Sequence, residues 1–260
     1  MSKVKLLVTT GCSFTQYPNT DITWSYHLSQ YLQCETLFLG QGAAGNGIIS
    51  KHTIYQVSEA LKKYEPEEIL VGTMWSGPDR AENFFAKGCP LKFNHINNGS
   101  DNFGNPIKIA RDKNFYLMNA GFDPLDEFSS TYYNSFYDRI GAYIRTIENI
   151  LRTQWFLKLN KIPYFMTTFQ NAVLPYVNHK ELTTELKHPD VKYLFDMIDF
   201  NNFLKITPDR ADHNNCYDWC DKYSGKQFRD KENDDHPSTE QHLEFTNRII
   251  IPYLKEKAMI

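Results

Sequence analysis

Two residues near opposite ends of this sequence are best suited to do chemistry together, a serine and a histidine. Ser13 follows a short apolar run that ends at Gly11, and a glycine there permits the tight turn that presents a hydroxyl at the end of a strand. His236 precedes the C-terminal helix, and a neutral imidazole near pH 7 can take a hydroxyl proton. The pair therefore predicts a nucleophile with its base, provided that the fold brings the two ends of the chain together.

Such a pair needs an acidic partner and hydrogen-bond donors for a developing oxyanion. Asp234 is the candidate that would orient His236 and stabilise its imidazolium form, and Asp235 is also close in sequence. The glycine-rich turn 40–47 offers backbone N–H groups to an oxyanion. Ser76 follows the third predicted strand, and ligands of open α/β sheets bind at the carboxyl ends of strands. We therefore expect Ser13, this turn and Ser76 at one edge of a sheet.

The elements that would position these residues alternate between strands and helices. Short apolar runs predict strands over 5–10, 36–39, 68–74 and 163–168. Apolar positions at helical spacing predict helices over 22–32, 48–64, 137–159 and 238–257. The last of these is expected to start at a capping box formed by Ser238 and Gln241 and to be interrupted by Pro252. The predicted fold class is α/β, a three-layer α/β/α sandwich with a central parallel sheet in a single domain, 1–260.

Residues 77 to about 134 interrupt this alternation. They are rich in Gly, Asn, Asp and Pro, with turn signals at Asn97-Asn98-Gly99 and Asn105-Pro106. A stretch of this length without clear periodicity is typical of a functional insertion or lid, and we expect irregular structure there. Residues 171–230 are also difficult to assign, with one or two short helices expected near 191–203.

Composition argues against several classes of partner. The net charge is −3 and the basic residues are scattered, which gives no indication of nucleic-acid or membrane binding. No apolar stretch approaches the roughly 20 residues of a membrane helix. The N-terminus lacks the apolar core of a signal peptide, so a cytoplasmic location is expected. The oligomeric state is not indicated.

Five cysteines, an odd number, argue against a disulfide framework. Cys216-x-x-x-Cys220 has only His213 as a close third ligand and no second cysteine pair, so reduced thiols are favoured over zinc. No metal or organic cofactor is predicted. His242, on the final helix, is expected to pack or to face solvent.

In chain order these landmarks resemble the sequence blocks of SGNH (GDSL-type) hydrolases. Gly11-Cys12-Ser13-Phe14 resembles the Gly-Asp-Ser-Leu block, and Gly40-Gln41-Gly42-Ala43-Ala44-Gly45 stands where the family has Asn-x-Gly-x-x-Gly. Asn233-Asp234-Asp235-His236-Pro237 stands in place of the Asp-x-x-His-Pro block. The resemblance implies a flavodoxin-like fold of SGNH type, with Ser13 as nucleophile, His236 as base and the Gly45 N–H as oxyanion donor. Asn46, beside Gly45, is expected to take part in binding the oxyanion or the substrate.

The sequence departs from the family pattern at three positions. Cys12 replaces the first-block aspartate, and Met74-Trp75-Ser76-Gly77 replaces the third block, Gly-x-Asn-Asp, so that Ser76, Trp75 or Arg80 would donate to the oxyanion in place of asparagine. Asn233 occupies the position of the triad aspartate; either Asp234 serves through a local bulge or the site is a Ser–His dyad. The start of the chain, with Arg80 and Glu82, resembles a branch often found in phage and bacterial genomes.

The expected function is a serine-dependent, esterase-like hydrolase or acyltransferase that acts on a small-molecule or glycan ester through an acyl-enzyme. Two other interpretations remain open. One is a catalytically inactive SGNH-like protein that binds a glycan or nucleotide. The other is a nucleotide-binding protein that uses the turn 40–47, whose glycines match Gly-x-Gly-x-x-Gly without a ribose-binding acid at the usual distance. Ser13 would then cap a helix, and Arg80 would be a surface residue.

Overall fold

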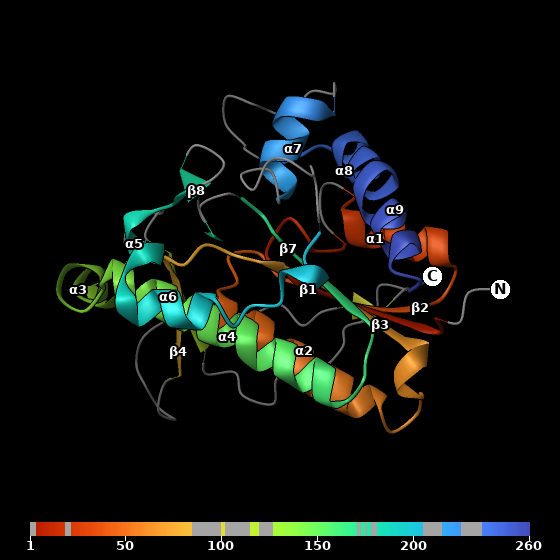
Figure 1. The fold of residues 1–260 in the computed structure, drawn as a ribbon, viewed down its shortest axis with the longest axis horizontal. Coiled ribbons are helices and arrows are strands. Elements are labelled where there is room, and N and C mark those ends of the chain that lie inside the picture. The colour runs from red at the N-terminus through yellow and green to blue at the C-terminus, as the bar shows by residue number, and fades with distance from the viewer. Residues whose placement is uncertain are drawn as a thin grey trace.

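A sheet of four parallel strands forms the centre of this mixed α/β protein, seen here in a computed structural model (Figure 1). The structure describes residues 4–18, 22–84, 100–101, 115–119, 127–170, 173–174, 176–177, 181–204, 215–224 and 236–260. The parallel strands, in spatial order, are β2 (Glu35–Gly40), β1 (Leu6–Gly11), β3 (Ile69–Trp75) and β7 (Tyr164–Thr168). A two-residue strand, β5 (Ser100–Asp101), pairs antiparallel with β2 at the edge.

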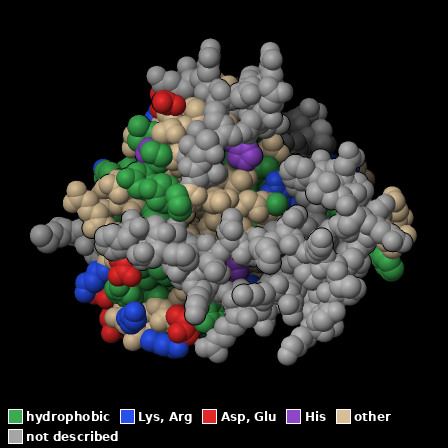
Figure 2. Space-filling view, turned by 180° about the vertical axis from the view of Figure 1, so that it is seen from behind, with side chains coloured by type: hydrophobic (Ala, Val, Ile, Leu, Met, Phe, Trp, Pro, Cys, Tyr) green, Lys and Arg blue, Asp and Glu red, His purple; other side chains and the backbone are tan. Residues whose placement is uncertain are grey.

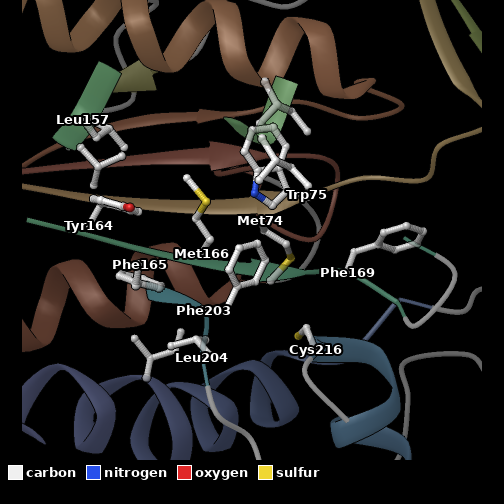
Figure 3. Close-up of a cluster of buried hydrophobic side chains, with 14 of the residues drawn as sticks. Met74, Trp75, Leu157, Tyr164, Phe165, Met166, Phe169, Phe203, Leu204 and Cys216 are labelled. Carbon is white, nitrogen blue, oxygen red and sulfur yellow. The ribbon is translucent and has the colours of Figure 1, made fainter. Parts of the chain in front are cut away.

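The four parallel strands begin and end within one residue of the ranges that the sequence predicts. Every residue of β1, β3 and β7 is buried, as expected for parallel strands that are covered on both faces. Figure 3 shows the alternation along β7, where Tyr164 and Met166 point to one side and Phe165 to the other. The apolar runs therefore identify the strands because both of their faces contribute to one core.

Helices lie on both sides of the sheet in Figure 1. On one side α2 (Asn46–Ala60) and α4 (Arg139–Leu159) pack against each other, and on the other α1 (Trp24–Leu32) packs against α8 (Thr239–Phe245), with α9 (Ile251–Glu256) beside them. Helix α2 ends at Ala60, four residues before its predicted end at 64, and residues 61–64 form a turn and a bend instead.

The C-terminal helix starts at the predicted capping box. Ser238 Oγ accepts the Gln241 N–H, and the Gln241 side chain accepts the Ser238 N–H. The interruption lies before Pro252 rather than at it, as a π-helical turn, Thr246–Ile250, between α8 and α9. A proline lacks an N–H and its ring clashes with the carbonyl four residues earlier, so the helix widens ahead of it.

The expectation of irregular structure over 77–134 is wrong for part of that range. Strand β4 (Arg80–Phe84) pairs antiparallel with β6 (Phe115–Asn119), and α3 (Glu127–Ser135) leads toward α4. Strand β6 contains a short apolar run, Phe115 to Met118, but the Gly, Asn, Asp and Pro residues of the surrounding segment favour irregular structure there. Residues 85–99, 102–114 and 120–126 lie outside the described residues, and the predicted lid function stays a prediction.

The remaining elements are short and follow β7. They are β8 (Tyr176–Val177), β9 (Glu181–Leu182), α5 (Thr184–Lys187), α6 (Pro189–Phe195), a 3-10 turn at Phe200–Asn202 and α7 (Cys216–Tyr223). Another 3-10 turn, Pro66–Glu68, precedes β3. Helix α6 and the second 3-10 turn confirm the short helices expected near 191–203.

Charges are mixed on the surface that Figure 2 shows. Its described acidic and basic side chains lie among one another instead of gathering by sign. Among the helices of the described residues, none combines the length and the apolar character needed to cross a membrane.

Candidate active site

The structure brings Ser13 and His236 into hydrogen-bond contact. Ser13 Oγ and His236 Nε2 are 2.7 Å apart, although 223 residues separate them in the chain. Ser13 lies in the turn after β1, a central strand, and His236 lies two residues before the cap of α8. Both residues are partly exposed. An imidazole nitrogen at this distance can accept the serine proton, which is the arrangement that nucleophilic catalysis by serine requires.

The turn that carries Ser13 is held by its neighbours. The Thr15 N–H donates to the Cys12 carbonyl over 2.9 Å, and Thr15 Oγ1 accepts the indole N–H of Trp24 over 3.1 Å. A Cβ at Gly11 would overlap the Thr15 side chain, so the turn closes this tightly only over a glycine. The position of the Ser13 hydroxyl is thus set by the end of β1 and by α1.

The glycine-rich turn packs directly against the serine turn. Gly11 and Gly40 are paired in the register of β1 and β2, and a Cβ on Gly40 would overlap the backbone of Thr15. Gln16 Oε1 accepts the Gly42 N–H over 2.7 Å, which ties the two turns together. Within the described part of the chain, the backbone N–H groups of Ser13 and Gly45 donate no hydrogen bond, as is required of oxyanion donors.

Asn46 braces the glycine-rich turn. Its Nδ2 donates to the Ser76 carbonyl over 2.9 Å and to Thr146 Oγ1 over 3.2 Å, and its Oδ1 accepts the Ser76 N–H over 2.8 Å. These contacts join the start of α2 to the end of β3 and to α4. Both N–H groups of the Asn46 amide are engaged within the protein, so the neighbouring Gly45 N–H is the more available donor for a reactant.

Ser76 and Arg80 form a second pair beyond Asn46. Ser76 is completely buried, and its Oγ accepts a hydrogen bond from Arg80 Nη1 over 2.8 Å. The Arg80 guanidinium also lies over the ring of Phe169, 5.1 Å from its centroid. Ser76 thereby holds the guanidinium in place, and Arg80 is the more available donor of the two.

An aromatic group connects Arg80 to His236. The Phe14 ring lies 4.9 Å from the His236 imidazole and 5.3 Å from the Phe169 ring, centroid to centroid, and Arg80 covers Phe169. Sequence reasoning did not select Phe169. Its position directly after β7, at the carboxyl end of a parallel strand, is the signal that identifies it.

Glu82 of β4 covers the N-terminus of α2 beside the glycine-rich turn. A Cβ on Gly45 or Gly47 would overlap its carboxylate oxygens, so both glycines make room for this side chain. Its Oε2 atom is buried without a hydrogen-bond partner among the described residues. Burial raises the pKa of Glu82 to about 7, although the facing N–H groups of Ile48 and Gly47 and the charges of Arg152 and Arg145 lower it in part.

His242 lies in a buried thiol cluster behind Phe14. The His242 imidazole is buried and 3.9 Å from Cys216 Sγ, which is 4.0 Å from Cys220 Sγ. Burial lowers the pKa of His242 to about 3 and, with the adjacent Cys220 thiol, raises that of Cys216 well above its usual range. His242 therefore packs as a neutral side chain, one of its two expected roles.

The thiols Cys12, Cys34, Cys216 and Cys220 are free. The described residues contain no group of three or more His, Cys, Asp or Glu side chains that could hold a metal ion. Asp234, the expected partner of His236, lies outside the described residues, as do Asn233, Asp235 and His213.

No protein-family model matches this sequence, and a search of curated proteins finds no significant relative. The chemistry of the site is therefore inferred from its geometry.

Proposed function

We propose that this protein is a serine-dependent, esterase-like hydrolase or acyltransferase, built as a three-layer α/β/α sandwich of SGNH type. The observation that carries the proposal is the 2.7 Å contact between Ser13 Oγ and His236 Nε2. The strand order β2-β1-β3-β7 supports it, because in flavodoxin-like sheets a ligand binds where the order reverses beside the first strand. Ser13 follows that strand directly.

In the proposed reaction His236 Nε2 takes the proton of Ser13 Oγ as this oxygen attacks the ester carbonyl carbon. The carbonyl electron pair moves to its oxygen, which accepts hydrogen bonds from the backbone N–H groups of Ser13 and Gly45. When the electron pair returns, the bond to the alcohol oxygen breaks and His236 gives that oxygen its proton. Water or another alcohol then attacks the acyl carbon while His236 takes its proton; the bond to Ser13 Oγ breaks, and His236 gives the proton to Ser13 Oγ.

Arg80 and Asp234 have supporting roles in this proposal. Arg80, held by Ser76 and Phe169, is the cation placed to contact the substrate beside the catalytic pair. Asp234 would orient His236; an Asp234→Asn variant with unchanged kcat would indicate a dyad. A nucleotide site in the turn 40–47 is less well supported, because the Glu82 carboxylate covers the helix N-terminus where a phosphate would bind.

A fluorophosphonate probe tests the nucleophile directly. We expect the wild-type protein to be labelled once, at Ser13 by peptide mapping, because only a serine with a base and an oxyanion site attacks such phosphorus centres. Ser13→Ala should abolish the label and His236→Ala should slow it by a factor of 100 or more, on the order of a general base contribution.

Ser58→Ala and His188→Ala serve as matched controls: Ser58 is exposed on α2, and His188 is half-buried at the N-cap of α6. Thermal melts establish that each variant is folded. Labelling at another serine, or equal labelling rates in wild type and His236→Ala, would show the proposed function to be wrong.

A further inference from the structure

A cavity of about 260 Å³ lies next to the glycine-rich turn, between the start of α2, strand β4 and the first half of α4. Its wall includes Asn46, Gly47, Arg80, Glu82, Arg145 and Asn149. The wall begins one residue beyond Gly45, and neither Ser13 nor His236 belongs to it. Ligand pockets for whole small molecules are about 300–1,000 Å³, so this cavity suits one part of a larger ligand.

Two arginine side chains supply hydrogen-bond donors to the cavity wall. A guanidinium carries five N–H groups, and among the described residues one bond is found for each arginine: Arg80 Nη1 to Ser76 Oγ, and Arg145 Nη2 to Tyr132 Oη over 3.2 Å. No carboxylate of the described residues lies within 4.0 Å of either guanidinium. Two cations without an acidic partner favour a ligand that brings negative charge and acceptor oxygens.

The single carboxylate among these wall residues offsets little of that charge. Glu82 is directed at Gly45 and Gly47, and its Oε2 is buried against the turn. The charged groups that act on it are Arg145 and Arg152, both of α4, and Arg80 lies two residues away on its own strand. The helix N-terminus is covered by Glu82, so the arginines supply the positive charge of the cavity.

Arg80 joins the cavity to the catalytic pair. One side of its guanidinium is fixed by Ser76 and Phe169, and Phe169 packs on Phe14, which packs on His236. Arg80 is therefore the residue shared by the cavity wall and by the packing around the catalytic pair.

We propose that this cavity binds an anionic group of the ester substrate, a carboxylate or a phosphate, with Arg145 and Arg80 as its partners. The inference rests on the proposed hydrolase function and extends it to a class of substrate. A bidentate contact between guanidinium and carboxylate or phosphate would hold the far end of the substrate, and Arg80 would contact the segment nearer the ester.

A matched pair of chromogenic esters tests the proposal, mono-4-nitrophenyl glutarate and the neutral 4-nitrophenyl pentanoate of the same length. We expect the wild-type enzyme to favour the anionic ester in kcat/KM. Arg145→Gln should lower the ratio of the two kcat/KM values by about 10- to 100-fold, mainly through KM, because a charge-assisted pair to the remote group is lost. Arg152→Gln, two turns along α4 and outside the wall residues, should leave the ratio unchanged.

Inhibition of pentanoate ester hydrolysis by free glutarate and by methyl phosphate distinguishes the two anions, and the better inhibitor identifies the group. Equal turnover of both esters, or an unchanged ratio in Arg145→Gln, would overturn the inference while leaving the hydrolase intact. If neither ester is hydrolysed and Ser13 is not labelled, the proposed function fails. In that case, calorimetric titration with free glutarate and methyl phosphate tests anion binding in the cavity independently of catalysis. If the wild type binds neither anion, or binds them no more tightly than Arg145→Gln does, the inference is overturned.

Discussion

Acid should weaken the fold through His242. The side chain is fully buried, and its pKa falls from the usual 6.5 to about 3 through burial and the nearby His27 and His236. Between these two pH values His242 is protonated in the unfolded chain but neutral in the folded protein. The free energy of unfolding therefore decreases as the pH falls below 6.5. At pH 5, about 1.5 pH units below the usual value, the loss is about 2 kcal/mol at 1.36 kcal/mol per unit.

Urea unfolding of wild type and His242→Gln at pH 7 and pH 5 measures this contribution. Other titrating groups contribute equally to both proteins, so the wild type should lose about 2 kcal/mol more than the variant between the two pH values. Equal losses in wild type and His242→Gln would refute the reasoning.

His52 provides a second test if His242→Gln is too unstable at pH 5. Burial of its side chain in α2 lowers the pKa of His52 to about 4, and its Nε2 has no partner among the described residues. The same argument gives a loss of about 2 kcal/mol at pH 5 that His52→Gln should remove.

Two other predictions follow from the packing. Gly45→Ala should lower the free energy of unfolding by about 1–3 kcal/mol, because the added Cβ would overlap Glu82 Oε2. Most of this loss should disappear when Gly45→Ala is combined with Glu82→Ala. If the losses of the two single variants simply add in the double variant, the contact is contradicted. The thiols of Cys12, Cys216 and Cys220 are buried, so they should react with Ellman's reagent only when the protein unfolds, as followed by peptide mapping. Rapid reaction of these thiols in the folded protein would contradict their burial.

The elements of this protein that could be predicted from the sequence are those whose signals are local. Strand β1 is an uninterrupted apolar run closed by Gly11, and α8 starts at a capping box contained within Ser238–Gln241. Ser13 and His236 could be named as a pair because each has a recognisable neighbour, Gly11 and Pro237. That they meet depends on parallel pairing between strands distant in sequence.

The rest of the site depends on contacts that no local pattern reveals. Glu82 lies on β4, whose partner strand β6 is distant in the sequence, so no local pattern reveals their pairing. Asn46 was expected to contact a reactant because of its place after Gly45, but both N–H groups of its amide donate to Ser76 and Thr146. The side-chain environment decides such roles, and this environment is assembled from residues 30 to 100 positions away.

The hydrogen bond between Ser13 and His236 spans 223 residues, which has a consequence for the protein while it is being made. Ser13 leaves the ribosome early and His236 leaves late, because domains emerge from their N-terminal side. A growing chain can form the serine turn as soon as β1 and β2 pair, yet it has no imidazole beside the hydroxyl. In the proposed mechanism the nascent protein therefore carries an unactivated serine until α8 docks against α1 and brings His236 beside it.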